Sequence, residues 1–327
     1  MLLSVYKKYR AYRLKKEEVR LNNKAERFSG LFDPTAPFSF AEFAECIESM
    51  GVQPSDNILL RLSSQAIPYL SEGLIDFYKK SFDYVDAGGG HIMSLSYSFD
   101  RSPLMYLALD KVFDPKSTPT TVGLCNEIFR RMDGTTRSAH PTHSVSVYGK
   151  RSKEITAEHH LNPHTYSLQS PFSHLYKYGK GKEIIIGLNH SSTAQHFIED
   201  KFSITGKISR PIINRMKIDG NTENHLFYAD NPFVKYTGYY KTDDFRSLLM
   251  ERGMLKQSVL NGISVYVYDC PKQHTDLPSI YQSDQAPFKR KYAKTFLLNQ
   301  IARPIVLNMF FKNESGHLVP KGNVPEK

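Results

Sequence analysis

The feature that most constrains this chain is a series of short apolar runs separated by segments with helical spacing. Each run has the length of a strand and is bounded by turn residues, which is typical of buried strands. Strands that alternate with helices favour a layered α/β domain. The expected strands are Ile58–Leu62, His91–Ser96, Glu183–Leu188 and Ile263–Tyr268.

The helical segments begin and end at residues that suit helix termini. Ser39 can cap a helix from Phe40 to Met50, and Gly51 follows its last turn. Thr242-Asp243-Asp244 caps a helix that runs through Glu251. Further helices are expected over 72–82, 126–132 and 194–200.

The two ends of the chain differ from its body. The first 27 residues lack Pro and Gly and place apolar side chains at helical spacing, which predicts a basic amphipathic helix. The tail after Pro304 is expected to be irregular. The expected organisation is a helix over 1–27, a linker over 28–39, a domain over 40–287 and a basic C-terminal extension over 288–327.

The formal net charge of +10 is concentrated in these ends. Residues 1–27 carry nine Lys or Arg against three Glu, and residues 288–327 carry eight against two, so each end has a charge of +6. The body between them therefore has a net charge of −2, and no nucleic-acid partner is expected. The basic ends suit weak contact with an anionic membrane surface.

Cysteine and hydropathy patterns indicate an intracellular, cytoplasmic protein. Cys46, Cys125 and Cys270 are far apart and have no CxxC spacing, so neither a disulfide framework nor a cysteine zinc site is indicated. No run approaches the roughly 18 apolar residues of a membrane span, and the charged N-terminus lacks the apolar core of a signal peptide.

Histidines are unusually dense in one region, with eight of the twelve between His140 and His196. Neutral imidazole accepts protons near pH 7, which invites acid–base or metal chemistry. Pro141 argues against a helical metal-binding pair formed by His140 and His143. Four others lie in polar, loop-like sequence and are expected at the surface or in turns: His159, His160, His164 and His174.

His196 differs because it follows a buried strand and a polar turn and lies in the first turn of a helix. Turns from strand to helix place side chains at the sheet edge, where ligands bind in α/β folds. Glu199 and Asp200 follow on the same helix face, and a carboxylate beside a histidine raises its basicity. These residues suit either a general base or a helix-start histidine paired with a surface acid.

Sequence signals for nucleotide and hydrolase sites are missing. The chain has no G-x-G-x-x-G after a strand, no P-loop and no G-x-S-x-G elbow. Ser63-Ser64 and Arg137-Ser138 are short polar clusters beside expected buried elements, where hydroxyls and backbone N–H groups can hold a phosphate or an amide.

Five blocks in order resemble the aminoglycoside 3-N-acetyltransferase family over roughly residues 40–275. They are "GVQPSDNILLRLSS", "DPKSTPTTVGLCNEIFRR", "RSAHPTHSVSVYG", "SPFSHLYKYGKGKEIIIGLNHSSTAQHFIED" and "DDFRSLLMERGMLKQSVLNGISVYVYD". The resemblance implies a three-layer α/β/α sandwich with a mixed central sheet. It also implies acetyl-CoA as donor, no metal, and direct transfer to an amine.

The resemblance also assigns roles to individual residues. His196 matches the family's general-base histidine and Glu199 the acid of the same motif, while Glu127 and His140 match positions that orient or assist. Eight residues match positions around acetyl-CoA: Ser63, Ser64, Thr118, Thr120, Gly123, Arg137, Ser138 and Ser144.

Departures from the family pattern affect the acceptor side. Leu62 stands where the family has a histidine, the turn before His196 is one residue shorter and lacks its Asp, and Ala194-Gln195 replace Ser-Leu. The body charge of −2 does not show the concentration of carboxylates that a polycationic aminoglycoside requires.

Four hypotheses follow. The first is an N-acetyltransferase acting on an amino sugar, for example in polysaccharide biosynthesis, and the second is antibiotic resistance through aminoglycoside acetylation. The third is a non-catalytic acetyl-CoA-binding or scaffold relative that docks through its basic ends. The fourth is a zinc hydrolase. A homodimer is expected from the resemblance.

Overall fold

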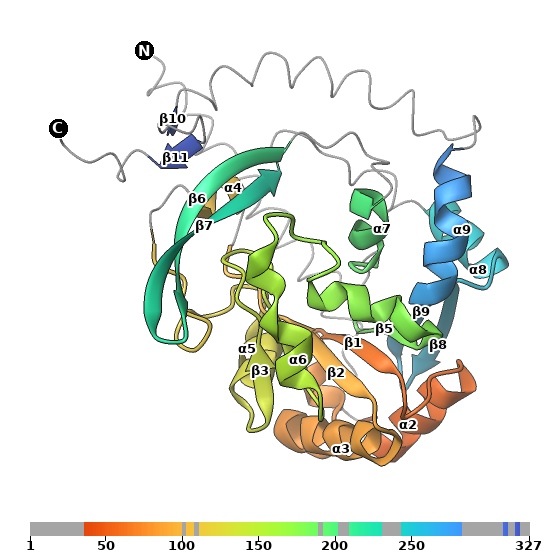
Figure 1. The fold of residues 1–327 in the computed structure, drawn as a ribbon. Helices are drawn as coiled ribbons and strands as arrows, with labels where there is room; N and C mark the ends of the chain where they lie inside the picture. Colours follow the sequence, from red (N-terminus) through yellow and green to blue (C-terminus); the bar gives the residue numbers. More distant parts are fainter. Residues whose placement is uncertain are drawn as a thin grey trace, which may run out of the picture.

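A computed structural model describes residues 36–99, 103–107, 111–188, 192–201, 209–230, 243–282, 310–312 and 318–320. The expected helix over 1–27, most of the linker and most of the C-terminal extension lie outside these ranges. The described chain forms a mixed seven-stranded sheet with helices on both faces and a second, four-stranded sheet (Figure 1). The predicted α/β class is confirmed. Among these residues no helix is long and apolar enough to cross a membrane.

The centre of the large sheet is parallel and its flanks are antiparallel. Strand β1 (Asn57–Leu62) pairs in parallel with β2 (His91–Leu95) and with β5 (Gly181–Ile186). The sheet order is β3-β4-β2-β1-β5-β9-β8, and every other pairing is antiparallel. The flanking strands are β3 (Thr135–Arg137), β4 (Val145–Tyr148), β8 (Leu255–Leu260) and β9 (Ile263–Asp269). All four predicted strands are present within two residues of their expected ends.

Helices α2 (Phe40–Ser49), α3 (Gly73–Gly88) and α5 (Leu124–Arg131) pack on one face of the large sheet. Ser39 and Glu42 form the capping box of α2, as the predicted cap requires. Helix α3 is longer than the predicted 72–82 and ends at Gly89, whose φ of 73° is the left-handed conformation of a helix C-terminus.

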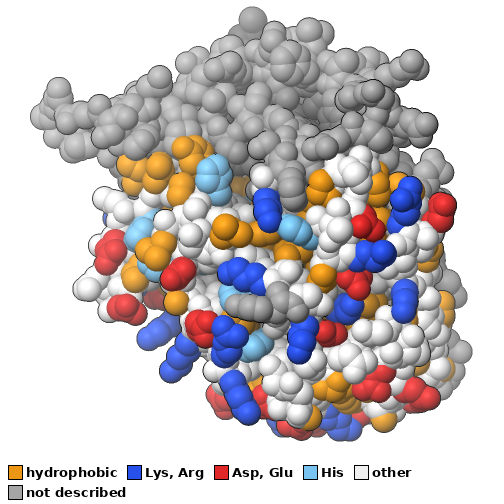
Figure 2. Space-filling model, turned by 45° about the vertical axis from the view of Figure 1, so that its right-hand side comes forward, with side chains coloured by type: hydrophobic (Ala, Val, Ile, Leu, Met, Phe, Trp, Pro, Cys, Tyr) orange, Lys and Arg blue, Asp and Glu red, His pale blue; other side chains and the backbone are white. Residues whose placement is uncertain are grey.

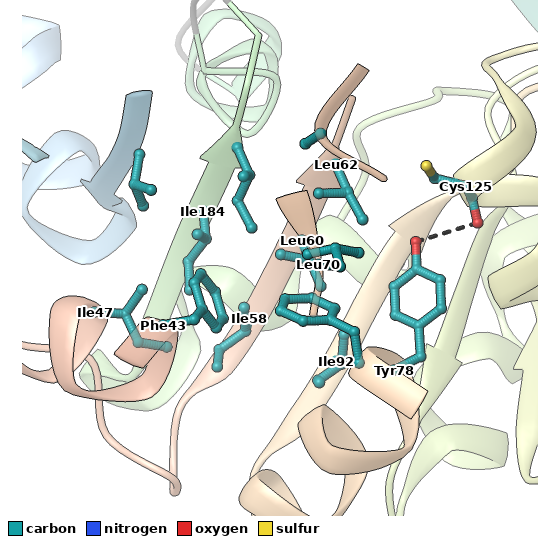
Figure 3. Close-up of a cluster of buried hydrophobic side chains, with 14 of the residues drawn as sticks. Phe43, Ile47, Ile58, Leu60, Leu62, Leu70, Tyr78, Ile92, Cys125 and Ile184 are labelled. Atoms are coloured by element: carbon teal, nitrogen blue, oxygen red, sulfur yellow. Dashed lines mark hydrogen bonds between the residues drawn. The ribbon is translucent and has the colours of Figure 1, made fainter. Parts of the chain in front are cut away.

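The core on this face is continuous from α2 to α5 (Figure 3). Ile58, Leu60 and Leu62 alternate along β1 so that all three point into it. The Tyr78 hydroxyl donates to the carbonyl of Cys125 at 3.2 Å, which ties α3 to the first turn of α5.

The opposite face carries the elements that position the functional site. Leu59 of β1 points there, against a cluster that includes Ile155, Phe172 and Phe197. A neighbouring cluster joins Ile185 of β5 to the remaining helices. The helices of this face are α6 (Ser152–Ala157), α7 (Gln195–Lys201), α8 (Asp243–Glu251) and α9 (Cys270–Gln282).

The smaller sheet is built on the hairpin β6 (Ser209–Ile218) and β7 (Asn221–Asp230). Asp219-Gly220 makes its tight turn with φ angles of 48° and 90°, and Asn261-Gly262 makes the β8–β9 turn with 48° and 86°. The hairpin packs beside α4 (Pro103–Leu107) through Ile212, Met216 and Phe227.

The tail after Pro304 is not wholly irregular, and that prediction was wrong for two short strands. β10 (Phe310–Lys312) and β11 (Leu318–Pro320) pair with each other, and Leu318 pairs with Ile212 of β6. Each strand has only three residues, too few for a sequence period to show.

Charges of both signs share the described surface. On the face shown in Figure 2, Lys and Arg side chains lie among Asp and Glu over the lower and right-hand parts, and histidines lie both among apolar side chains and beside the basic ones. This mixture agrees with a body that has little net charge.

Candidate functional site

The carboxyl ends of β1, β2 and β5 lie at one edge of the sheet because these three strands are parallel. Ser63-Ser64 follow β1, the segment 96–99 follows β2, and the turn that begins α7 follows β5. Ligands bind at this edge in open α/β sheets. Segments that are far apart in the sequence therefore meet where a site is expected.

The two serines after β1 have different environments. Ser63 is buried, and its Oγ accepts the Gln65 amide at 3.1 Å to cap the 3-10 helix Ser64–Tyr69. Ser64 is exposed, and its Oγ lies 3.9 Å from Sγ of Cys125 in the first turn of α5. Gly123 precedes that turn with a φ of 113°, and α5 has no side-chain cap. An exposed hydroxyl and an uncapped helix start together suit an anion or amide of a ligand.

The loop over 118–121 is fixed by Glu127. One Glu127 oxygen accepts the Thr120 amide at 2.9 Å, and the carboxylate forms ion pairs with Arg130 at 2.5 Å and Arg131 at 2.7 Å. Burial raises the pKa of Glu127, but the hydrogen bonds from Arg130, the Thr120 amide and Arg131 outweigh it and lower the pKa to about 2. Glu127 therefore stays ionised and orients the loop.

Arg137 joins the loops at this edge. Its guanidinium donates to the Ser96 carbonyl at 2.6 Å, to Ser144 Oγ at 2.8 Å and to the carbonyl of Thr118. Burial, with the nearby charge of Arg130, lowers the pKa of Arg137 to about 9. Ser144 is fully buried and also donates to the Ser96 carbonyl at 2.6 Å. Arg137 and Ser144 thus brace the loops that a ligand would contact.

A buried imidazole pair lies beneath the edge. The ring centroids of His140 and His159 are 4.6 Å apart, and both side chains are fully buried. Ser138 Oγ lies 2.8 Å from Nδ1 of His159 and accepts the Val145 amide at 2.9 Å. His159 was expected at the surface or in a turn. It lies in the 3-10 turn over 159–161 but is buried, because Ser138 and the Thr165 carbonyl satisfy both ring nitrogens in the interior.

His140 differs from its neighbour in its hydrogen bonding. Nδ1 accepts the His143 amide at 3.0 Å, whereas Nε2 has no hydrogen-bond partner among the described residues. Burial, with the neighbouring His159, holds the pKa of His140 well below its usual value, so the ring is neutral.

His196 lies in the first turn of α7, as predicted, and is half-buried. Its ring centroid is 5.6 Å from that of Tyr166, and Tyr166 is 5.7 Å from His143. His143 in turn lies 5.9 Å from His140. A continuous series of rings therefore connects the two histidines that the sequence singled out. The side chain of Glu199 lies outside the described residues.

A buried carboxylate holds the turn before His196. Glu183 on β5 accepts the Thr193 amide at 2.8 Å and the Ala194 amide at 3.1 Å, and it forms an ion pair with Arg61 of β1 at 2.9 Å. Neither Glu183 nor Arg61 was predicted from the sequence as a site residue. The available signal was a carboxylate at the start of an otherwise apolar run, "EIII".

The described ranges contain no candidate metal site. No three His, Cys, Asp or Glu side chains among these residues form a group that could hold a metal ion. His160 and His225 approach each other with ring centroids 5.4 Å apart, where the 3-10 turn over 159–161 meets β7.

A family model described as aminoglycoside 3-N-acetyltransferase matches residues 101–273, more than half of the chain. The chain belongs to this family. The match includes β3, β4, β5, α7 and β9 and most of the residues described above, but not Arg61, Ser63, Ser64 or Ser96.

Curated relatives agree with this membership. Aminoglycoside N(3)-acetyltransferase III of Acinetobacter baumannii is 30% identical over 177 residues, which are 50% of this chain and 60% of the relative. The chain thus matches less than two thirds of that relative's length.

Solved structures with low sequence identity to this chain have a similar fold. A mutant of aminoglycoside acetyltransferase AAC(3)-IVa in complex with a gentamicin has a TM-score of 0.62 at 18% identity, covering 77% of this chain and 91% of that one. AAC-IIIb in a binary structure with CoASH has a TM-score of 0.61 at 20% identity, covering 77% of this chain and all of that one.

Most residues that the family resemblance singled out lie along this edge. Ser64 and Gly123 are exposed. Thr118 and Thr120 are partly exposed, although both of their hydroxyls form hydrogen bonds within the protein. The other four also form hydrogen bonds with protein atoms: Ser63, Arg137, Ser138 and Ser144. Leu62, where the family pattern has a histidine, points into the core on the α2–α3 face, away from α7. The roles of the eight residues toward acetyl-CoA remain predictions.

Proposed function

We propose that this chain transfers the acetyl group of acetyl-CoA directly to an amino group of an aminoglycoside, with His196 as general base. The observation that carries the proposal is the position of His196. It lies at the start of α7, at the edge where β1, β2 and β5 end, in a chain of the aminoglycoside 3-N-acetyltransferase family.

The donor would lie against the surface that the exposed Ser64 hydroxyl and the first turn of α5 form together. Free backbone N–H groups at a helix start favour phosphate and amide oxygens. The loop over 118–121 borders this region and is held by Glu127 and Arg137. The ionised Glu127 and the braced Arg137 would keep the loop in place while the donor binds and leaves.

In the reaction, His196 removes a proton from the acceptor's ammonium group. The amine nitrogen attacks the thioester carbonyl carbon and a C–N bond forms. The C–S bond then breaks, and the second proton that the nitrogen loses passes to the sulfur, so that an amide forms and coenzyme A leaves as the thiol. Backbone N–H groups at the sheet edge are suited to the oxyanion that develops on the carbonyl oxygen.

Aminoglycosides are the first candidate acceptors because the relatives are named for them. A less cationic amino sugar, such as a polysaccharide precursor, is the second candidate. It is favoured by one observation: Glu127 and Glu183, the two carboxylates described at this edge, are both paired with arginines. Paired carboxylates attract a polycation less strongly.

The test is thiol release from acetyl-CoA across aminoglycosides, free amino sugars and nucleotide-linked amino sugars, with His196→Ala as the matched control. Release with aminoglycosides in the parent, and its loss in the variant, supports the proposal. Release with amino sugars alone selects the second candidate. Binding of acetyl-CoA without release with any amine would instead support the scaffold hypothesis.

A further inference from the structure

Glu183 is a fully buried carboxylate whose two oxygens each accept two hydrogen bonds. Its side chain is 0% exposed and lies on the sheet face that carries α7. One oxygen accepts from Arg61 at 2.9 Å and from the Thr193 amide at 2.8 Å. The other accepts from the Ala194 amide at 3.1 Å and from the Ser192 hydroxyl.

These contacts continue directly into α7. The Gln195 amide donates to Ser192 Oγ at 3.3 Å, and the His196 amide donates to the Thr193 carbonyl at 3.1 Å. Glu183 therefore binds Ser192 and Thr193, and each of these two residues accepts a hydrogen bond from the first turn of α7. The backbone of His196 is two hydrogen bonds away from a carboxylate that the central sheet fixes.

Arg61 completes this arrangement from the neighbouring strand. Glu183 and Ile185 of β5 are paired with Leu59 and Arg61 of β1, so the arginine lies two residues closer to the sheet edge than the carboxylate. Its side chain is 13% exposed. A buried ion pair is costly to desolvate and is a weak source of stability, so a role other than stability is the better explanation of its presence here.

We propose that the Arg61–Glu183 ion pair is the positioning element of His196. Glu183 fixes the turn over 192–194, and Arg61 holds the carboxylate in the orientation in which it accepts the turn's amides. The ion pair thereby determines the position and orientation of the His196 imidazole at the start of α7. The inference rests on the proposed function for the role of His196, and on the contacts alone for the anchoring of the turn.

The test separates positioning from stability by removing both charges together. Arg61→Met with Glu183→Leu leaves no unpaired buried charge, and such replacements are usually tolerated. Exchange of the Thr193 and Ala194 amide hydrogens is then compared with the parent. The kcat and the KM for acetyl-CoA are measured on the same samples.

Lys182→Met is the matched control. Lys182 is the next residue on β5 and forms an ion pair with Asp269 at 2.7 Å, but none of its described contacts is with the turn over 192–194. Its variant should keep the parent's amide exchange and kcat. Equal losses in the control and the double variant would show a general effect on the sheet and would overturn the proposal.

The expected result for the double variant is a folded protein with at least roughly tenfold faster exchange at Thr193 and Ala194. Its kcat should fall about 100-fold, the cost of a displacement of about 1 Å at a reacting group, while the KM for acetyl-CoA stays within about threefold. Parent-like exchange and kcat would overturn the proposal. If the parent itself acetylates nothing, the proposed function fails while amide exchange still decides whether Glu183 anchors the turn.

Discussion

The imidazole of His196 lies against the ring of Tyr166, with a centroid separation of 5.6 Å. Tyr166 is buried and packs on Phe172 at 4.9 Å, and its hydroxyl lies 3.4 Å from that of Tyr97. One side of the His196 ring is thus covered by Tyr166, which packs with Phe172 and with Tyr97 just after the carboxyl end of β2. A general base with a fixed ring plane can accept a proton from a single direction.

His196→Ala should lower kcat by about 10²- to 10⁴-fold, the usual contribution of a general base. The side chain is half-buried at the start of a helix, so stability should change little. Thiol release and thermal melting measure the two effects. His164→Ala is the control, since that exposed ring stacks on Tyr228 of the hairpin. Undiminished turnover in the His196 variant would remove it as the base.

Tyr166→Phe and Tyr166→Ala should differ sharply. The phenylalanine keeps the ring that packs on His196 and loses the hydroxyl, whose contact with Tyr97 is long at 3.4 Å, so kcat should stay within about threefold. The alanine removes a buried ring and should cost about 3 kcal/mol or more of stability, together with most of the turnover. Equal losses in both variants would point to the hydroxyl instead.

Local sequence signals predicted the central strands of the large sheet well. The apolar runs correspond to four adjacent strands of the large sheet, β2, β1, β5 and β9, and the order of strand, polar turn and helix placed His196 correctly. Asp219-Gly220 and Asn261-Gly262 are equally local signals for the hairpin turns that the structure contains.

Long-range contacts explain what the sequence could not predict. His159 lies in polar sequence and resembles a surface residue, yet Ser138, 21 residues earlier, makes its burial favourable. Glu183 and Arg61 are 122 residues apart, and only the parallel pairing of β1 with β5 brings them together. Hydrophobic patterns do not encode such polar pairs, because their partners come from other strands.

Gly123→Ala should destabilise the start of α5. Gly123 has φ 113° and ψ 162°, a backbone conformation that residues other than glycine essentially never adopt. Holding alanine in it should cost about 1 to 3 kcal/mol of stability. The expected loss of stability does not come from a steric clash, since a Cβ on residue 123 would meet only Ser64 Oγ at 3.9 Å. Because the helix start borders the proposed donor region, the KM for acetyl-CoA should rise as well.

Gly89→Asn provides the comparison for this variant. Gly89 has φ 73° and ψ 22°, a left-handed conformation that asparagine tolerates, so its variant should lose less than about 1 kcal/mol and keep the parent's KM. Urea unfolding and steady-state kinetics on both variants decide the matter. A Gly123 variant as stable as the parent would show that α5 can begin differently.

Stability should fall as the pH drops from about 6.5 to about 4, because His159 is buried in its neutral form. Burial lowers its pKa to about 4, against the opposing hydrogen bond to the Thr165 carbonyl. Between these values the unfolded chain binds a proton that the folded chain does not. The contribution of His159 is therefore complete above about pH 6.5 and decreases by up to about 1.4 kcal/mol per pH unit below it.

Urea unfolding at several pH values measures the slope that His159 contributes. His159→Gln should flatten the slope, and His164→Gln, at an exposed position, should leave it unchanged. If the His159 variant does not fold, NMR titration of the parent's His159 ring gives the same answer, because a ring that stays neutral in the folded state takes up its proton only near its lowered pKa. A proton taken up near the ordinary histidine value of about 6.5 would contradict the prediction.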